Sequence, residues 1–253
     1  MAAEDRGQRI EDRRQKKQDV RLEAGGDRPQ APPACSLRPA VFRRRTVGLS
    51  LTAVVLVVAV WTWEEVIEDR VIPKRWGVVE AGIICRSGQL SAALVKRTLI
   101  EHGIKVIVNL TAETNADKDQ QAEREAAQEL GIEVKRFPLR GDGTGDITQY
   151  AGAVEAVVEA KRAGKPVLVH CAAGSQRTGG TIAFYRLLVE GRSPAFVVEE
   201  MTRYDWDPKD DTILLEYINA HIGELAAMLK DRGVIEEIPD PLPVLSTSRA
   251  PNP

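Results

Sequence analysis

The stretch PVLVHCAAGSQRTGG, residues 166–180, decides the expected fold. Its apolar run at 167–169 is typical of a buried strand, which would place Cys171 just past the carboxyl end of that strand. Gly174 lies in the loop that follows, and a helix is expected to begin near Arg177. This order of elements predicts a tight loop whose backbone surrounds a thiol.

The loop after this strand is expected to form a cradle for a tetrahedral dianion. Its backbone N–H groups and the N-terminus of the following helix would point inward and attract negative charge. The same field would hold the pKa of Cys171 below the value of about 8.5 for a free cysteine. Arg177 can bind two phosphate oxygens at once, and Gly174 accepts a positive φ. The predicted phosphate-binding residues are Ala172, Ala173, Gly174, Ser175, Gln176 and Arg177.

Strands and helices are expected to alternate over residues 70–235. The expected strands are Gly82–Cys85, Lys105–Leu110, Glu133–Phe137 and Pro166–His170. The expected helices are Ser91–His102, Asn115–Leu130, Ile147–Ala163, Arg177–Glu190, Pro194–Arg203 and Asp211–Lys230. This alternation predicts an α/β sandwich whose central sheet is largely parallel and flanked by helices.

With these elements in place, the sequence resembles the cysteine-dependent protein tyrosine and dual-specificity phosphatases, and within them the compact, atypical dual-specificity branch. The signature His-Cys-x-x-Gly-x-x-Arg-Thr lies at residues 170–178. Further similar segments are RSGQL at 86–90, VIVNL at 106–110 and FYR at 184–186. The resemblance covers residues 72–220 and implies that the α/β unit is a phosphatase domain.

The resemblance implies catalysis by double displacement through a phosphocysteine. Cys171 is then the expected nucleophile, Arg177 the residue that binds the phosphoryl group, and an aspartate in an upstream loop the general acid. Thr178 is expected to hydrogen-bond the sulfur in the second step. His170 is expected to orient the loop rather than to act as a base. The resemblance implies neither a metal nor a cofactor.

Two aspartates compete for the role of the general acid. Both lie in the glycine-rich segment Arg140–Asp146, between an expected strand and an expected helix. Asp146 directly precedes that helix, where its carboxylate would serve as the N-cap. Asp142 lies inside the loop, about where the family places its acid, and its glycine neighbours would let the loop close over substrate. Asp142 is therefore the expected acid and Asp146 the alternative, although the segment has more glycine than the family pattern and lies nearer to Cys171.

The N-terminal part of the chain is expected to hold a tail and a membrane anchor. Residues 1–45 carry 12 basic and 7 acidic side chains and almost no apolar run, which predicts a disordered basic tail. Residues 46–63 carry no charge, follow Arg43–Arg45 and end with Trp61 and Trp63, which predicts a single transmembrane helix. A buried core helix or a cleaved signal peptide fits less well, because neither a polar stripe nor a cleavage site is visible. By the positive-inside rule, the arginines predict a cytoplasmic N-terminus and a catalytic domain outside the cytoplasm.

Composition excludes several other classes of protein. Three cysteines, Cys35, Cys85 and Cys171, are too few for a disulfide scaffold or a structural zinc site. Cys85 is expected to be a small buried hydrophobe, with a protective disulfide to Cys171 as the alternative. The net charge is −2, and the basic tail is interleaved with acids, so nucleic acid is not an expected partner. The Pro-rich residues 236–253 predict a disordered C-terminal tail.

The whole sequence predicts a membrane-anchored phosphatase that hydrolyses phosphomonoesters. The side chains between Cys171 and Arg177 carry no charge, whereas relatives that act on densely phosphorylated inositols usually place lysines there. A phosphorylated protein or small phosphomonoester is therefore the expected substrate, and inositol phosphates or phosphoinositides are the alternative. A catalytically weak phosphate-binding module is the alternative from another class. A rhodanese-type sulfurtransferase fits less well, because its loop returns to the helix in fewer residues.

Overall fold

A computed structural model describes residues 72–246. The strands of this part are β1 (Gly77–Glu80), β2 (Ile84–Ser87), β3 (Val106–Asn109), β4 (Glu133–Arg136) and β5 (Val167–His170). The helices are α4 (Val95–Glu101), α5 (Lys118–Leu130), α6 (Ile147–Arg162), α7 (Gln176–Phe184), α8 (Pro194–Arg203) and α9 (Thr212–Asp231), with a π-helix, η2 (Tyr185–Val189), directly after α7.

The strands form one five-stranded mixed sheet in the order β1-β2-β5-β3-β4. The central strand β5 pairs in parallel with β2 and β3, and β3 pairs in parallel with β4. At the edge, β1 pairs with β2 in the antiparallel sense. The register sets Ser87, His170 and Asn109 side by side, so that the carboxyl ends of β2, β5 and β3 meet at one edge of the sheet.

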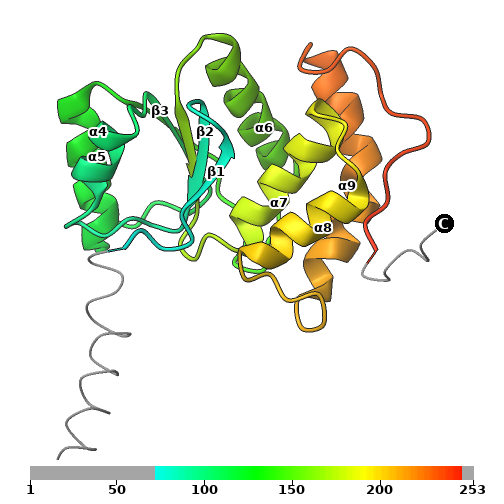
Figure 1. Ribbon diagram of the computed structural model, residues 1–253, viewed down its shortest axis with the longest axis horizontal. Helices are drawn as coiled ribbons and strands as arrows, with labels where there is room; N and C mark the ends of the chain where they lie inside the picture. The colour runs from blue at the N-terminus through cyan, green and yellow to red at the C-terminus, as the bar shows by residue number, and fades with distance from the viewer. Residues whose placement is uncertain (1–71, 247–253) are drawn as a thin grey trace, which may run out of the picture. The chain divides into compact units, whose positions relative to one another are not determined.

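Helices cover both faces of the sheet, with α4 and α5 on one side and α6 to α9 on the other (Figure 1). Ile107 and Leu168 pack in the core under α4 and α5, whereas their neighbours Val108 and Val169 pack in the core under α6, α7 and α9. This alternation follows from the pleat, which points successive side chains to opposite faces. Strands buried on both faces read as continuous apolar runs, as VIVN in β3 and VLVH in β5 do.

The expected α/β sandwich with helices on both faces is confirmed, but the sheet is mixed because of β1, which the sequence analysis missed. This strand has the short sequence GVVE, and its Val78 is 53% exposed at the sheet edge. Such a four-residue edge strand lacks the long apolar run that marks the buried strands.

The expected helix Arg177–Glu190 is interrupted. It begins as α7 and widens into the π-helix η2. In η2, the buried guanidinium of Arg186 donates hydrogen bonds to Glu200 and to the Val79 carbonyl. The widened turn is thereby tied to α8 and β1.

The prediction of a disordered tail from residue 236 onward is wrong for residues 236–246. Leu245 is 1% exposed and packs in the same core as α9. Asn219 on α9 donates to the Leu245 carbonyl and accepts from the Leu245 N–H, each at 2.8 Å. The buried leucine and this paired hydrogen bond hold the segment despite its prolines. Residues 247–253 lie outside the described part.

The predicted basic tail, residues 1–45, and the predicted transmembrane helix, residues 46–63, also lie outside the described residues. Between residues 72 and 246, none of the helices combines the length and apolar character needed to cross a bilayer.

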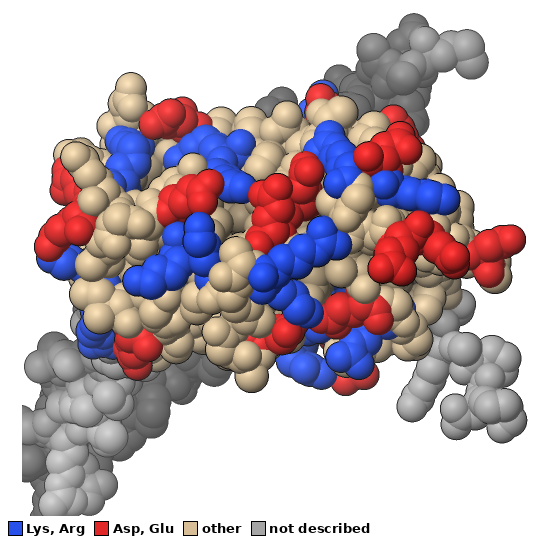
Figure 2. Space-filling model, turned by 90° about the horizontal axis from the view of Figure 1, so that it is seen from above, with Lys and Arg blue, Asp and Glu red and all other residues tan. Residues whose placement is uncertain are grey.

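Acidic and basic side chains of the described part are interspersed on the face drawn in Figure 2. Several of the charges are paired, for example Lys96 with Glu129 at 2.6 Å and Lys135 with Glu159 at 2.8 Å. Exposed pairs of this kind contribute about 0–1 kcal/mol each, so they affect solubility more than stability.

Candidate active site

The signature loop, residues 171–177, connects the central strand β5 to α7 and surrounds a buried thiol. Cys171 is 1% exposed. Gly174 has a φ of 84°, a left-handed conformation that favours glycine. A Cβ on Gly174 would also lie 2.5 Å from the backbone nitrogen of Gly88, so the loop packs closely against the end of β2. The predicted tight loop is thus present, and both its positive φ and its close contact with Gly88 require glycine at position 174.

The carbonyl groups of the signature loop are bound from outside the loop. Gln89 N–H donates to Ala172 O at 3.0 Å, Arg75 Nη1 to Ala173 O at 2.8 Å, and Arg86 Nη2 to Gly174 O at 2.7 Å. Because these carbonyls turn outward, the backbone N–H groups of the same peptides are free to face the centre of the loop. Successive inward N–H groups form an anion-binding concavity, which the N-terminus of α7 completes.

Arg86 lies behind this cradle rather than inside it. Its side chain is fully buried, and its guanidinium carbon lies 3.8 Å from the centre of the Tyr204 ring. Burial lowers the pKa of Arg86 to about 10, so the side chain still carries its charge at neutral pH. A buried cation therefore supports the loop from the side away from solvent.

The environment of Cys171 favours the thiolate. Burial alone would raise the pKa of the Cys171 thiol, but the Thr178 hydroxyl, the charge of Arg177 and the backbone N–H groups of Gly174 and Thr178 together lower it. The Gly174 nitrogen lies 3.1 Å from Cys171 Sγ. The lowered pKa agrees with the expectation from the sequence, and so does the position of Thr178 beside the sulfur.

The remaining loop side chains point to different neighbours. Ser175 Oγ donates to the backbone carbonyl of Asp205 at 3.0 Å, and Gln176 Nε2 donates to Asp211 Oδ2 at 3.0 Å. Arg177 Nε is buried and has no hydrogen-bond partner among residues 72–246. The guanidinium of Arg177 is therefore available for an oxyanion held in the loop.

His170 lies against a buried carboxylate below the signature loop. Its Nε2 lies 2.9 Å from Glu123 Oε2, and both side chains are at most 2% exposed. Burial lowers the pKa of His170, but the charge and hydrogen bond of Glu123 outweigh this effect and raise it overall. This geometry fits the expected orienting role of His170.

The acid loop, residues 140–146, lies beside the signature loop. A Cβ on Gly143 would come within 2.8 Å of Leu214 Cδ1 and 3.3 Å of Gln176 Cβ, and this glycine has a φ of 84°. Asp142 is exposed, and its Oδ1 accepts from Thr144 N at 2.9 Å and from Thr144 Oγ1 at 2.8 Å. These hydrogen bonds hold the pKa of Asp142 below its usual range.

The two candidate acids have different surroundings. Asp146 caps α6, where its Oδ1 accepts from Thr148 N at 2.9 Å, as the sequence predicts. The charge of Asp146 raises the pKa of Tyr217. By contrast, the charges of Asp142 and Cys171 raise the pKa of the buried Tyr150, and the charge of Arg177 lowers it. Tyr150 therefore lies close enough to both Asp142 and Cys171 to respond to their charges, whereas Asp146 is engaged as the cap of α6.

Cys85 and Cys171 belong to opposite faces of the sheet. Cys85 on β2 is paired in register with Leu168, and both pack in the core under α4 and α5, whereas Cys171 packs in the other core. Both cysteines are free, and burial raises the pKa of Cys85. The expectation of a small buried hydrophobe at residue 85 is confirmed.

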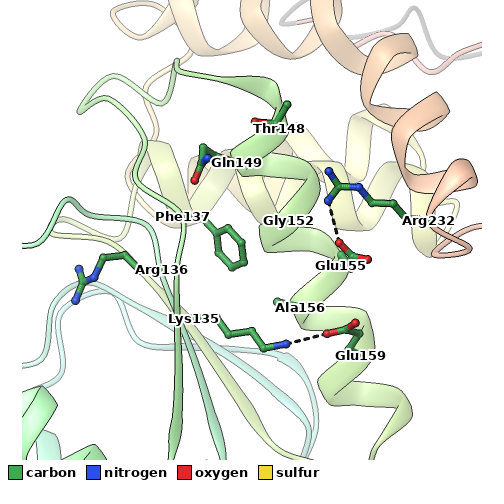
Figure 3. Close-up of a pocket in the computed structure, with 10 residues that line it drawn as sticks. All are labelled: Lys135, Arg136, Phe137, Thr148, Gln149, Gly152, Glu155, Ala156, Glu159 and Arg232. Atoms are coloured by element: carbon green, nitrogen blue, oxygen red, sulfur yellow. Dashed lines mark hydrogen bonds and ion pairs between the residues drawn. The ribbon is translucent and has the colours of Figure 1, made fainter.

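A groove of about 560 Å³ lies away from the signature loop, between β4 and α6 (Figure 3). Its basic side chains are already engaged: Lys135 with Glu159 at 2.8 Å and Arg232 with Glu155 at 2.9 Å. The ring of Phe137 packs against Gly152, where a Cβ would lie 2.5 Å from it. Arg136, the third basic residue of the groove, donates to the Thr111 carbonyl at 2.9 Å, so all three basic side chains have a partner within the fold. Within residues 72–246, histidine, cysteine, aspartate and glutamate do not form a cluster that could hold a metal ion.

Sequence reasoning missed three residues that shape the site: Arg75, Glu123 and Asp205. Arg75 binds both the Ala173 carbonyl and the Asp205 carboxylate, and only the fold brings these together. Glu123 could have been found from the helical pattern of α5, because it lies on the same buried face as Gln120, Ala126 and Ala127. A charged residue in the buried stripe of a helix indicates a partner in the interior.

Comparisons with known proteins agree with this geometry. Residues 59–210 match the family described as DSP-PTPase phosphatase fused to NAD+ Kinase. The dual specificity protein phosphatase TpbA of Pseudomonas aeruginosa (strain UCBPP-PA14) is 34% identical over 80 residues, which are 32% of this chain and 36% of TpbA. The match thus spans about a third of the length of that relative.

Solved structures share the fold. The crystal structure of P. aeruginosa TpbA has a TM-score of 0.50 at 24% identity, covering 61% of this chain and 91% of that chain. The core catalytic domain of the PP-IP phosphatase SIW14 from S. cerevisiae has a TM-score of 0.51 at 20% identity, covering 64% and 95%. Since the family match extends over more than half of the sequence, this chain belongs to that family of DSP-PTPase phosphatases, which confirms the enzyme class expected from residues 170–178.

Proposed function

We propose that the protein hydrolyses phosphomonoesters through a phosphocysteine on Cys171, with Arg177 as the phosphoryl-binding residue and Asp142 as the general acid. The observation that supports this most strongly is the orientation of the signature loop. Three of its carbonyls are bound from outside, and its N–H groups are left for an oxyanion above a thiol of lowered pKa.

In the first step, the Cys171 thiolate attacks phosphorus in line with the leaving oxygen. A P–S bond forms while the P–O bond breaks, and Asp142 donates its proton to the departing alkoxide or phenoxide. The charge on the three equatorial oxygens is stabilised by Arg177 and by the loop N–H groups, which are fixed before the reaction begins.

In the second step, a water molecule attacks the phosphocysteine. The Asp142 carboxylate now accepts a proton from that water, the P–S bond breaks, and the electron pair returns to Cys171 sulfur. Thr178 assists by donating its hydroxyl proton to a hydrogen bond with the leaving thiolate, since it already lowers the pKa of Cys171. Inorganic phosphate then leaves the cradle.

The substrate class we favour is a phosphorylated protein or a small monophosphate. TpbA is described as a dual specificity protein phosphatase, which supports this choice. In this chain, Gln176 is uncharged and its amide is bound to the carboxylate of Asp211. Such a carboxylate at the loop repels additional phosphate groups, which disfavours densely phosphorylated inositols. Hydrolysis of phosphopeptides compared with inositol polyphosphates tests this choice directly.

We also propose that residues 46–63 anchor the protein in a membrane, with the N-terminus cytoplasmic and the catalytic domain outside the cytoplasm. The support is the uncharged run itself, the arginines before it and the tryptophans at its end. Full-length protein is expected to stay with membranes at alkaline pH, and a variant lacking residues 46–63 is expected to be released. Release of both forms would contradict the anchor.

The test of the phosphatase function is the hydrolysis of a generic aryl phosphate by the full-length chain, with EDTA and a reductant present. Turnover that survives EDTA and disappears in Cys171→Ser supports a cysteine phosphatase. A wild type that is folded and reduced, binds phosphate and yet shows no turnover contradicts it and favours the phosphate-binding module instead.

A further inference from the structure

Below the signature loop, one carboxylate contacts three side chains that lie at the ends of three different strands. Glu123 on α5 is 1% exposed. Its Oε2 lies 2.9 Å from His170 Nε2 and 3.1 Å from Gln89 Nε2, and its Oε1 accepts from Asn109 Nδ2 at 2.8 Å. These partners follow or end β5, β2 and β3, the strands whose carboxyl ends meet under the loop.

Two of these partners continue into the signature loop. His170 is joined to Cys171 by a peptide bond, and Gln89 also donates its backbone N–H to the Ala172 carbonyl at 3.0 Å. Asn109 accepts from Thr111 N at 2.9 Å, which fixes its amide so that its NH₂ group faces Glu123. The carboxylate thus contacts groups that lead into the thiol-bearing loop from both sides.

We propose that Glu123 is a positioning residue of the active site, which acts through His170 to hold the signature loop and a positive charge next to the Cys171 thiolate. This inference rests on the proposed cysteine mechanism. Buried charges require partners, and here one carboxylate accepts hydrogen bonds from two amides and lies 2.9 Å from the imidazole Nε2 of His170. Burial raises the pKa of Glu123, but His170 and the two amide hydrogen bonds lower it overall, and Glu123 in turn raises the pKa of His170, so each member of the pair favours the charged form of the other.

Other charged and titratable groups also face the thiol, and their contributions are retained when Glu123 is changed. They are Arg177 on α7, Arg86 on β2, Tyr150 on α6 and, through Tyr150, Asp142 of the acid loop; the loop itself also contacts the charged side chains of Arg75 before β1 and Asp211 before α9. Loss of Glu123 is therefore expected to weaken the thiolate without abolishing it.

The test is the alkylation rate of Cys171 by iodoacetamide as a function of pH, measured by mass spectrometry on the full-length chain. Glu123→Gln is expected to move the midpoint to higher pH and to slow alkylation at pH 6 by about tenfold, because a neighbouring positive charge is lost. Glu123→Asp, which keeps the charge, is expected to restore most of the rate. Glu129→Gln, an exposed position on the same helix, is the matched control and is expected to behave as wild type.

A purely structural role predicts a different pattern. Glu123→Gln would then lower the melting temperature and leave the alkylation midpoint unchanged, and this result would overturn the proposal. If Glu123→Gln does not fold, His170→Gln removes the same contact from the other side, and an unchanged midpoint in that variant overturns the proposal equally. Because alkylation does not require turnover, a wild type that lacks phosphatase activity but shows these shifts refutes the proposed function and still supports the role of Glu123.

Discussion

In the signature loop, three backbone carbonyls are bound from outside and the thiol is 1% exposed, whereas in the acid loop Asp142 is exposed and accepts hydrogen bonds from Thr144. The first loop is built to bind an oxyanion as it stands. In the proposed mechanism, Asp142 of the second loop must leave Thr144 before its carboxylate can protonate a leaving group. The nucleophile of this mechanism is therefore preorganised, whereas the acid has to change its hydrogen bonds before it acts.

Removal of the nucleophile is expected to have the largest effect. Cys171→Ser should lower kcat by about 10⁴-fold or more, because a serine hydroxyl does not ionise in a field that stabilises a thiolate. Phosphate binding should persist, since the N–H cradle and Arg177 are unchanged. Steady-state kinetics and calorimetric phosphate titration check this pair of outcomes, and a variant with substantial turnover would argue against covalent catalysis.

The next largest effect separates the two aspartates of the acid loop. Asp142→Asn should lower kcat by about 10²–10⁴-fold for substrates with poor leaving groups, because proton donation is lost. Asp146→Asn should keep kcat near the wild-type value, and any change should appear in stability by at most about 1 kcal/mol, because it alters only the cap of α6. Reversed results in the same assay would assign the acid to Asp146.

Support of the signature loop from behind can be tested at Arg86. Arg86→Met should lower kcat/KM by about tenfold, since it leaves the buried Gly174 carbonyl without its donor at a cost of about 1–3 kcal/mol. Arg75→Ala, at a more exposed donor, should cost less. Equal losses in both variants would show that the buried position of Arg86 has no special importance.

The pH dependence of kcat/KM follows from the signs of the two pKa shifts. The rate should rise with pH as Cys171 ionises, and its lowered pKa moves this limb to lower pH. The rate should fall as Asp142 loses its proton, and its lowered pKa moves this limb downward as well. The optimum is therefore expected on the acidic side of neutrality, and an optimum in the alkaline range would contradict these assignments.

The smallest predicted effect concerns Thr144. Thr144→Ala removes one of the two hydrogen bonds to Asp142, so the pKa of Asp142 should rise and the falling limb should move to higher pH. Because such a hydrogen bond contributes about 1 kcal/mol, kcat/KM on that limb should increase by up to about fivefold. A decrease would mean that Thr144 aligns the acid rather than restrains it.

The same contrast explains what could be predicted from the sequence. The strand, cysteine, glycine and arginine of the signature loop follow one another in the sequence, so the local sequence predicts the loop and its reactive residues, although Arg75, Arg86 and Gln89 hold its carbonyls from outside. The N-cap role of Asp146 is equally local and was predicted. Both features depend on residues that are close together in the sequence.

Contacts made across the fold could not be predicted in this way. Glu123 reaches His170 only because α5 packs beside the carboxyl end of β5, and Arg75 reaches the loop from before β1. The fixed conformation of residues 236–246 depends on a hydrogen bond to Asn219, which lies far away in the sequence. Composition indicated a loose tail there, but a buried leucine and two hydrogen bonds determine the outcome.

The most direct test of the central claim is a rapid acid quench of the full-length chain with a ³²P-labelled aryl phosphate, followed by peptide mapping. We predict a stoichiometric label on Cys171 that is absent in Cys171→Ser and increases in Thr178→Ala, where release of the sulfur is slowed. Steady turnover without any label on Cys171, or a label that persists in Cys171→Ser, would contradict the phosphocysteine mechanism.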